Sequence, residues 1–345
     1  MKNGLSYRNA GVNIAAADAT KHAMKKKIGS SDKRVLNSLG AFASLFDARF
    51  PGYRHPILVL KTEEPGSKQK IAFEHGRIAS VCEDMINHLI NDIAVMGATP
   101  LSVQDCVVCG KLEKNVILKI VESIAKAARA QGATLTGGET SEQPGIVPAG
   151  TYILTSSVVG VVEKSKIIDG SRIRKGDSVL AVASNGLHTN GYTLVRALMK
   201  KHLAILRKRI GGKSFIDAIL TPHKCYFQAL KGIFGNSGLH GMAHITGGGI
   251  EGNLNRILPK SLDAAIDLEK IRVLPIFKLI HEMGNVPDRE MLRTFNMGVG
   301  LTIVCSKKEM AKIQSHLEHH GCRSYPIGTI VKGKGIVRSS GKLQW

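Results

Sequence analysis

The sequence predicts an α/β protein with two domains. Its 345 residues, 43% of them hydrophobic, are enough to bury two cores. Segments with apolar residues at helical spacing alternate with short β-branched runs along the chain, which indicates helices layered on sheets. Residues 163–177 carry many charges and little apolar periodicity, so we place the domain boundary within them. The expected domains are residues 1–168 and 169–345.

The first half is expected to be irregular up to about residue 55, apart from one helix near 18–28. A strand is predicted at 57–61 and an amphipathic helix at 79–96, where apolar residues recur every three or four positions. A second amphipathic helix should span 115–131, with Gly132 placed to end it. A short strand should then give way to a glycine-rich acidic loop, TGGETSEQPG, before a β-branched strand at 151–162.

The second half repeats a pattern of strand, polar loop and helix. A buried strand at 179–183 leads through the loop SNGLHTNG to a helix that ends near residue 200. A basic helical stretch follows, and a second loop at 244–249 precedes a helix that begins near Ile250. Residues 293–304 should run from a loop into a strand. A helix at 309–320 and a strand at 324–330 complete the expected domain.

The helix expected at 79–96 carries polar residues away from its apolar stripe. Asp84, Asn87, His88 and Asn91 place a carboxylate, an imidazole and two amides on one side of the helix. This polar face of the helix either belongs to a functional site or is exposed to solvent. The spacing of the residues does not distinguish the two.

The formal net charge of +21 favours anionic partners. The densest basic runs are Lys25–Lys27 and Arg207–Arg209, but only 5% of residues are aromatic and no basic run is interleaved with aromatic residues. Proteins that bind single-stranded nucleic acid usually combine the two, so a solvated basic surface is the favoured interpretation. We therefore expect no nucleic-acid partner, and a basic field that attracts small anions such as nucleotides.

The six cysteines lie mostly among apolar neighbours, which suits free thiols better than a disulfide framework. Cys106 and Cys109 have the spacing of metal ligands, but residues three apart on a strand point to opposite faces, so we expect no metal there. No segment approaches the length of a membrane span, and the first residues lack the apolar core of a signal peptide. We expect a cytoplasmic protein with no membrane partner.

Four segments combine glycine with hydroxyl or amide side chains beside an expected strand or helix: TGGET, HTNGY, HITGGG and FNMGVG. Unpaired backbone N–H groups and the macrodipole at a helix start favour anions, so these loops suit phosphate groups. Each loop taken alone could be a flexible connector. None has the P-loop or dinucleotide-binding pattern. The residues by themselves therefore predict a two-domain α/β protein that binds phosphorylated small molecules.

Seven motifs in order give the chain a family resemblance: LSYRNAGV, INDIAVMGATPL, LTGGETSEQPG, VGVVEKSKIIDGSRIRKGD, HTNGYTLVR, AHITGGGIEGNLNRILP and RTFNMGVGL. The chain resembles the aminoimidazole ribonucleotide synthetases, also called phosphoribosylformylglycinamidine cyclo-ligases. The resemblance implies an ATP- and Mg²⁺-dependent closure of the imidazole ring in purine biosynthesis. It also implies a two-domain cyclo-ligase-like α/β (α+β) fold. In this family the N-terminal domains of a homodimer form a shared barrel, and the C-terminal domain has a mixed sheet with helices.

Individual residues match the family's site positions. On the ATP side these are Lys25, Gly40, Glu63, Lys68, Asp84, Asn91, Asp92, Gly137, Gly138, Glu139 and Thr140. On the substrate side they are His188, Thr189, Asn190, Gly191, Tyr192, Thr246, Gly247, Gly248 and Asn296. The resemblance implies metal ligands at Asp84 and Glu63, and catalytic residues at His244, Lys25 and Asp84. His244 could be a general acid or a positioning group, or it could be a structural histidine.

The chain departs from the family on the ATP side. Where the family has TDGVGTK this chain has TEEPGSK, residues 62–68, and where the family has GGLGGFG it has NSLGAFA, residues 37–43. Asn13 and Ile153 replace aspartates, and Ser156 replaces a glycine. Added β-carbons obstruct the approach of backbone to phosphate, so we expect weaker ATP binding than is usual in the family.

Three alternatives to the cyclo-ligase remain at this point. One is a catalytically weakened paralogue that binds a phosphorylated metabolite as a sensor or partner protein. Another is a sibling family such as selenophosphate synthetase or thiamine-phosphate kinase, which HTNGYTLVR and RTFNMGVGL favour less. The third is nucleic-acid binding, which a steeply salt-dependent shift with random DNA or RNA would support.

Overall fold

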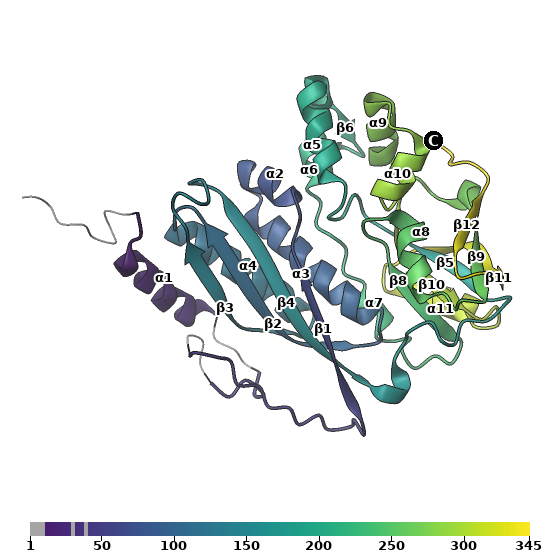
Figure 1. Cartoon of the computed structure of the whole chain (residues 1–345), viewed down its shortest axis with the longest axis horizontal. Coiled ribbons are helices and arrows are strands. Elements are labelled where there is room, and N and C mark those ends of the chain that lie inside the picture. Colours follow the sequence, from purple (N-terminus) through teal and green to yellow (C-terminus); the bar gives the residue numbers. More distant parts are fainter. Residues whose placement is uncertain (1–10, 29–31, 38–40) are drawn as a thin grey trace, which may run out of the picture. The chain divides into compact units, whose positions relative to one another are not determined.

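The computed structural model describes residues 11–28, 32–37 and 41–345 (Figure 1). Contacts divide the chain into two compact units. The first unit comprises Met1–Leu89 and Pro100–Val161, and the second comprises Ile90–Thr99 and Val162–Trp345. The predicted boundary at residues 168 and 169 stays a prediction.

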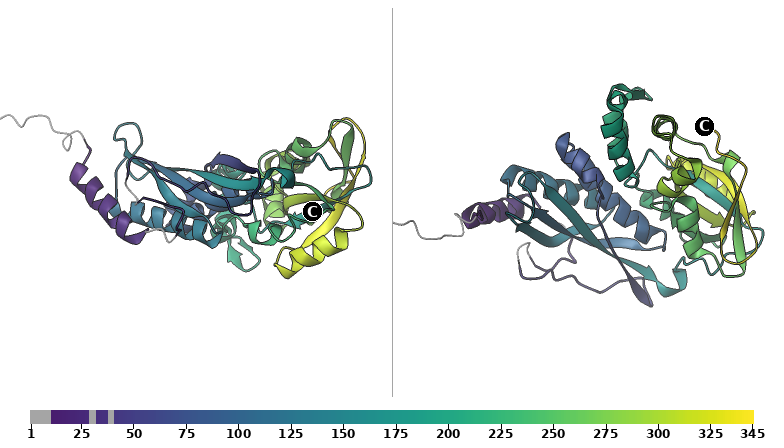
Figure 2. Two further views of the ribbon diagram at one scale, coloured as in Figure 1. Left: turned by 90° about the horizontal axis from the view of Figure 1, so that it is seen from below. Right: turned by 45° about the horizontal axis from the view of Figure 1, so that its top comes forward.

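The first unit is built on a four-stranded sheet with the order β1-β4-β2-β3 (Figure 1). Its strands are β1 (Pro56–Glu63), β2 (Thr99–Cys109), β3 (Thr134–Glu142) and β4 (Tyr152–Glu163). Its helices are α1 (Ile14–Lys27), α2 (Lys68–Glu74), α3 (Ile78–Ala94, whose last turn groups with the second unit) and α4 (Lys114–Ala130). Helix α4 packs on β3, and α1 packs along α4 (Figure 2).

The second unit has a six-stranded mixed sheet with the order β12-β9-β11-β5-β10-β8. Only β12 and β9 pair in parallel, and the other neighbours are antiparallel. The strands are β5 (Ser178–Ala183), β8 (Leu239–His244), β9 (Leu262–Asp267), β10 (Val299–Cys305), β11 (Ser324–Lys332) and β12 (Val337–Ser340). The short strands β6 (Arg209–Ile210) and β7 (Lys213–Ser214) form a separate hairpin.

Helices connect these strands. They are α5 (Tyr192–Lys201), α6 (Phe215–Ile219), α7 (Phe227–Leu230), α8 (Gly249–Leu254), α9 (Pro275–Gly284), α10 (Asp288–Thr294) and α11 (Met310–His319). Single 3-10 turns lie at Lys164–Lys166, Leu203–Arg207, Asn255–Ile257 and Leu268–Lys270. The predicted fold class, mixed sheets with helices in two parts, is confirmed.

Most predicted elements are present within a few residues of their predicted ends. Gly132 follows α4 with a φ of +77° and donates its N–H to the Arg129 carbonyl, so it ends the helix as expected. The first helix begins earlier than predicted because the Asn13 side chain accepts a hydrogen bond from the N–H of Ala16, which is an N-cap. Cys106 and Cys109 lie on opposite faces of β2, as predicted, since Cys109 is buried and Cys106 is only partly so.

One prediction was wrong: TGGETSE belongs to strand β3 rather than to a loop. β3 pairs in parallel with β2, and Gly138 lies opposite Asp105 in the register. A β-carbon on Gly138 would lie 2.0 Å from Oδ1 of Asp105, so glycine is needed here to make room for a carboxylate. Sequence reasoning interpreted this glycine as a sign of a loop.

The polar side of α3 is not solvated. Asp84 is fully buried, and its Oδ1 accepts a hydrogen bond of 2.7 Å from Nζ of Lys68, which is also fully buried. Burial lowers the pKa of Lys68, while the neighbouring Asp84 raises it. Two charges can remain in an apolar interior only because each offsets the other, so this pair constrains how α2 packs on α3.

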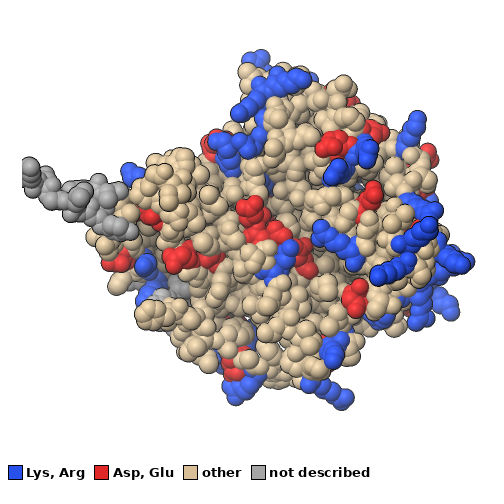
Figure 3. Space-filling model, viewed as in Figure 1, with Lys and Arg blue, Asp and Glu red and all other residues tan. Residues whose placement is uncertain are grey.

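No helix among the described residues combines the length and apolar character that a membrane span requires. Figure 3 shows Lys and Arg side chains interspersed with Asp and Glu.

We predict that Lys68→Met lowers the free energy of unfolding by about 3 to 5 kcal/mol, because it leaves the Asp84 carboxylate buried without its cation. The double variant Lys68→Met/Asp84→Leu should regain most of this loss. Lys70→Met is the matched control, since the Lys70–Glu74 pair is exposed and contributes less than about 1 kcal/mol. Chemical denaturation measures all three. A loss in Lys68→Met no larger than in Lys70→Met would contradict this account.

Candidate functional site

A large cavity of about 1090 Å³ lies within the first unit. Helix α1, residues 41–44, Val121 of α4 and strands β2, β3 and β4 contribute residues to its lining. The lining residues include Lys21, Lys25, Ala41–Ser44, Gln104–Cys106, Thr136–Thr140 and Thr155–Ser157. The cavity is large enough for a nucleotide.

The charges in this cavity suit a phosphate group held together with a cation. Lys21 and Lys25 are exposed at the wall formed by α1. Asp105 and Glu139 bring two carboxyl groups from β2 and β3. Burial raises the pKa of Asp105 to about 7.

Five of the residues predicted for ATP line this cavity: Lys25, Gly137, Gly138, Glu139 and Thr140. Gly40 lies outside the described residues. Glu63 is paired with Lys61 at 2.7 Å. Glu63, Lys68 and Asp84 are not among the lining residues. Thr62 is connected to the cavity, because its hydroxyl lies 2.8 Å from the hydroxyl of the lining residue Ser157.

Asn91 and Asp92 belong to the second unit by their contacts. The Asn91 amide donates to the Lys224 carbonyl and accepts from the N–H of Tyr226, so it holds the segment 224–226. Asp92 binds His244, as described below. Among the described residues, neither Asp84 nor Glu63 belongs to a group of three side chains placed to hold a metal ion.

The predicted substrate loops meet at one edge of the second unit's sheet. Strand β10 lies between β5 and β8 and is antiparallel to both, with Val299 opposite Ala183 and Leu301 opposite His244. The ends of β5 and β8 therefore lie beside the start of β10. The N–H of Ser184 donates to the Gly298 carbonyl, and the N–H of Ile245 donates to the Gly300 carbonyl.

Hydrogen bonds hold these loops to one another. Asn296 is buried, and its Oδ1 accepts from the Ser184 hydroxyl and from the N–H of Gly298. Its amide donates to the Gly186 carbonyl. Asn253 binds the carbonyls of Thr246, Gly247 and Gly249. Asn296 therefore holds the loops that follow β5 and precede β10 in place, in addition to being one of the predicted site residues.

Several residues of these loops have left-handed backbone. His188 has a φ of 61° and Met297 a φ of 55°, which is uncommon for residues other than glycine. Gly191 and Gly248 have φ values of 80° and 95° at the starts of α5 and α8. Strained non-glycine residues gather at functional sites more often than elsewhere, which supports the prediction for this edge.

Tyr192 is largely a packing residue. It is buried, and its hydroxyl donates to the carbonyl of Ile219, with the carbonyl of His188 also within hydrogen-bond distance. Thr189 is buried as well, while Asn190 is partly exposed and lies with its Oδ1 beside Gly247. Asn190 and Gly247 are therefore the predicted residues best placed to meet a ligand.

His244 is oriented by Asp92. The Nδ1 atom of His244 lies 2.7 Å from Oδ1 of Asp92, so Nδ1 carries the proton that it donates. The Nε2 atom of His244 lies 2.9 Å from Nε2 of His223, and in a neutral His244 with its proton on Nδ1 this Nε2 accepts the proton of His223. A carboxylate that fixes the tautomer of a histidine is typical of functional histidines.

Sequence reasoning missed Lys21, Asp105 and His223. Asp105 lies in the alternating segment SVQDCVV, where an acid at a buried position of a strand is the available signal. His223 lies in the irregular segment TPHKCY and carries no sequence signal of its own.

Comparisons with known proteins match both units. The family described as AIR synthase related protein, N-terminal domain, matches residues 55–162, and its C-terminal domain matches residues 174–339. The phosphoribosylformylglycinamidine cyclo-ligase of Methylobacillus flagellatus is 39% identical over 330 residues, which cover 95% of each chain. That of Burkholderia multivorans is 40% identical over 331 residues, covering 95% of this chain and 93% of the relative.

The chain belongs to the phosphoribosylformylglycinamidine cyclo-ligase family. The resemblance stated from sequence motifs is thereby confirmed. Solved structures of the wider fold are also similar. Escherichia coli HypE, a hydrogenase maturation protein, has a TM-score of 0.68 at 15% identity and covers 94% of both chains. The thiamine-monophosphate kinase of Stenotrophomonas maltophilia has a TM-score of 0.65 at 15% identity, covering 95% of this chain and 97% of the kinase. Identity near 40% favours the cyclo-ligases over these sibling families.

We predict that the contribution of Asp105 to the stability of this cyclo-ligase family member falls as pH rises from about 4 to about 7. The folded state raises the pKa of Asp105 from 3.8 to about 7, so it binds a proton more tightly than the unfolded chain. The stabilisation that comes from protonated Asp105 is fully present below pH 4 and is lost as pH rises through 7. Asp105→Asn should remove up to about 4 kcal/mol of the pH dependence. Glu139→Gln, an exposed acid of the same cavity, is the control for denaturation curves measured across this range. Equal slopes in Asp105→Asn and the unmodified protein would contradict the assignment.

Proposed function

We propose that this protein closes the imidazole ring of formylglycinamidine ribonucleotide to give aminoimidazole ribonucleotide, with ATP converted to ADP and phosphate. The observation that carries the proposal is the identity of about 40% to cyclo-ligases along 95% of the chain, which includes both units. A weakened paralogue that only senses a metabolite is the second candidate, because the ATP-side segments 37–43 and 62–68 are altered.

The cavity of the first unit is the proposed ATP site. A HypE structure of similar fold was solved in complex with ATP, which supports a nucleotide role for this fold. Lys21 and Lys25 would approach the phosphates from α1, and Gly137 and Gly138 line the cavity on β3. The carboxylate of Glu139, which is exposed in the cavity, is an oxygen donor of the kind that Mg²⁺ prefers. Bound Mg²⁺ would neutralise charge on the phosphoryl group during transfer.

The loops at the β5, β8 and β10 edge are the proposed ribonucleotide site. Backbone N–H groups at the start of α5 and the Asn190 amide would hold the phosphate of the substrate. The activated formyl oxygen leaves as phosphate when a substrate nitrogen attacks the formyl carbon. That nitrogen must lose a proton, and His244, with Nδ1–H held by Asp92, can accept it at Nε2 once His223 turns away.

A homodimer with a shared barrel remains our proposal. Edge strand β1 and its neighbour β4 expose Leu58, Leu60 and Ile153 on one side of the sheet. An exposed apolar row on an edge strand favours association with a second sheet. A monomeric mass in solution would exclude it. A cytoplasmic location also remains a proposal.

The test of the proposed function is ADP release with and without formylglycinamidine ribonucleotide. We predict release that requires the ribonucleotide, and ATP binding that is weak and dependent on Mg²⁺. Replacing residues 62–67 by TDGVGT and residues 37–43 by GGLGGFG should tighten ATP binding and raise ADP release together, because both remove obstructing side chains. Ribonucleotide binding without ADP release in either protein would favour the paralogue.

We predict that Asn190→Ala and Gly248→Val raise the KM for the ribonucleotide more than tenfold, since a charge-assisted hydrogen bond contributes about 1.5 to 3 kcal/mol. Valine is also strained at Gly248, where φ is +95°. Gly235→Val is the control, because a β-carbon there meets open space. An unchanged KM in both variants, with intact melting curves, would mean that these loops are structural.

A further inference from the structure

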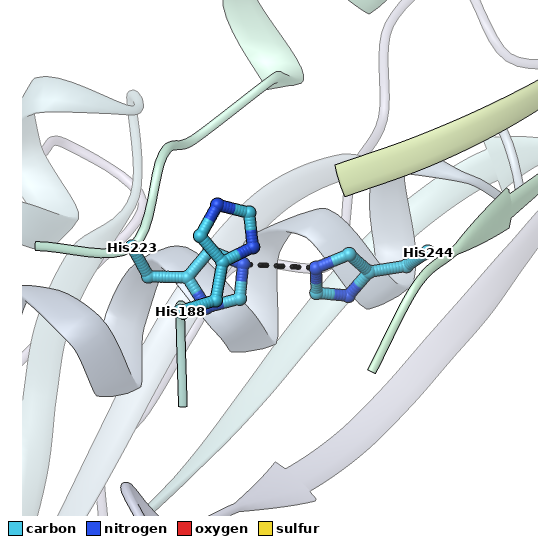
Figure 4. A group of neighbouring side chains, drawn as sticks. All are labelled: His188, His223 and His244. Atoms are coloured by element: carbon cyan, nitrogen blue, oxygen red, sulfur yellow. Dashed lines mark hydrogen bonds between the residues drawn. The ribbon is translucent and has the colours of Figure 1, made fainter. Parts of the chain in front are cut away.

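Three histidines of the second unit converge in its interior (Figure 4). His188 comes from the loop after β5, His223 from the segment before α7, and His244 from the end of β8. Their exposed fractions are 1%, 1% and 5%. One ligand nitrogen from each lies within 4.8 Å of those of the other two.

The contacts within the group are close. Nε2 of His223 lies 2.9 Å from Nε2 of His244, and the ring of His223 stacks on that of His188 with centroids 3.9 Å apart. Two basic nitrogens that face one another can share one proton or one metal ion. A β-carbon on Gly300 would lie 1.9 Å from the Tyr226 hydroxyl and 3.0 Å from Cε1 of His188, so glycine there leaves room for both side chains.

Asp92 supplies the usual support of a metal-bound histidine. Its carboxylate accepts the Nδ1 proton of His244, which directs the lone pair of Nε2 toward the other two rings. Histidine ligands of zinc almost always donate their second N–H to a carboxylate or carbonyl in this way. Asn185 restrains His188 similarly, with its Oδ1 3.0 Å from Nε2 of that ring.

We propose that His188, His223 and His244 form a three-histidine site for a divalent transition metal such as Zn²⁺, with Asp92 as the supporting carboxylate. Three imidazoles with an open fourth position are a known zinc ligand set. Imidazole suits Zn²⁺, Co²⁺ or Ni²⁺, whereas Mg²⁺ prefers oxygen, so this site differs in chemistry from the proposed ATP site.

Metal coordination needs an adjustment of the three side chains. Zn–N bonds of about 2.0 to 2.1 Å at tetrahedral angles put ligand nitrogens about 3.3 Å apart. The nitrogens here lie within 4.8 Å of one another, and side-chain rotations that unstack His188 from His223 would have to bring them to that spacing.

Metal at this site would also engage His244. If the proposed function holds, the metal takes the Nε2 lone pair and should inhibit ring closure. This consequence rests on the proposed function, but the binding itself does not, and binding is what the experiment measures.

The experiment titrates the chelator-treated full chain with Co²⁺ and then displaces it with Zn²⁺. We expect one tightly bound Co²⁺ per chain with the visible absorption of tetrahedral nitrogen coordination, and a higher melting temperature with Zn²⁺. His223→Gln should weaken binding more than about 100-fold, since it removes a ligand. Asp92→Asn should weaken it about 10- to 100-fold, which is the effect of losing a supporting carboxylate.

A surface pair provides the control. His316 and His320 lie four residues apart at the end of α11, with ring centroids 4.3 Å apart, and could hold a metal weakly. His320→Ala should leave the tetrahedral Co²⁺ signal unchanged. Melting curves measured in chelator establish whether each variant is folded. If His223→Gln does not fold, Asp92→Asn alone provides the test.

Three results would overturn the proposal. They are loss of the signal in His320→Ala, Co²⁺ binding only with octahedral absorption, and affinity unchanged in both His223→Gln and Asp92→Asn. Any of these results would mean that the three histidines form a hydrogen-bonded group and do not bind a metal ion. This test does not measure ADP release, so the metal-binding result stands even if the proposed function is wrong.

Discussion

The antiparallel pairing of β10 with both β5 and β8 is the constraint on which the second unit's site depends. Because the chain direction of β10 opposes that of its neighbours, the loops that leave β5 and β8 lie beside the loop that enters β10. Residues as distant in sequence as Ser184 and Asn296 are thereby in hydrogen-bond contact. The polar loops are consequences of this register, and a shift of one residue would point their side chains to the other face.

Packing then decides which side chains remain available to a ligand. Tyr192 and Thr189 lie in the interior, and Asn253 binds backbone carbonyls of the HITGGG loop. These three polar residues therefore serve to hold the loops together as much as to bind a ligand. In the first unit, the Lys68–Asp84 pair has the corresponding role: two residues predicted to contact ATP are joined in the core.

Sequence reasoning was most successful where a local pattern determines the structure. Helix α4 and its glycine end, strand β5 and the helix α5 that follows all depend on neighbouring residues, and they were predicted nearly to the residue. Motif order gave the family, which the full-length relatives confirm. Gly138 of β3 was misread because the reason for a glycine there, the Asp105 carboxylate on the next strand, is 33 residues away in the sequence. His223 was missed for the same reason, since its significance comes from His244 and His188 on other segments.

The measurement that tests the central claim most directly follows the oxygen atom through the reaction. Formylglycinamidine ribonucleotide carrying ¹⁸O in its formyl group would be incubated with the protein, ATP and Mg²⁺, and the products analysed by mass spectrometry. If the formyl oxygen is activated by phosphoryl transfer and expelled on ring closure, the label must appear in inorganic phosphate, with one aminoimidazole ribonucleotide formed per ADP. Phosphate without label, or ADP formed without aminoimidazole ribonucleotide, would contradict the account.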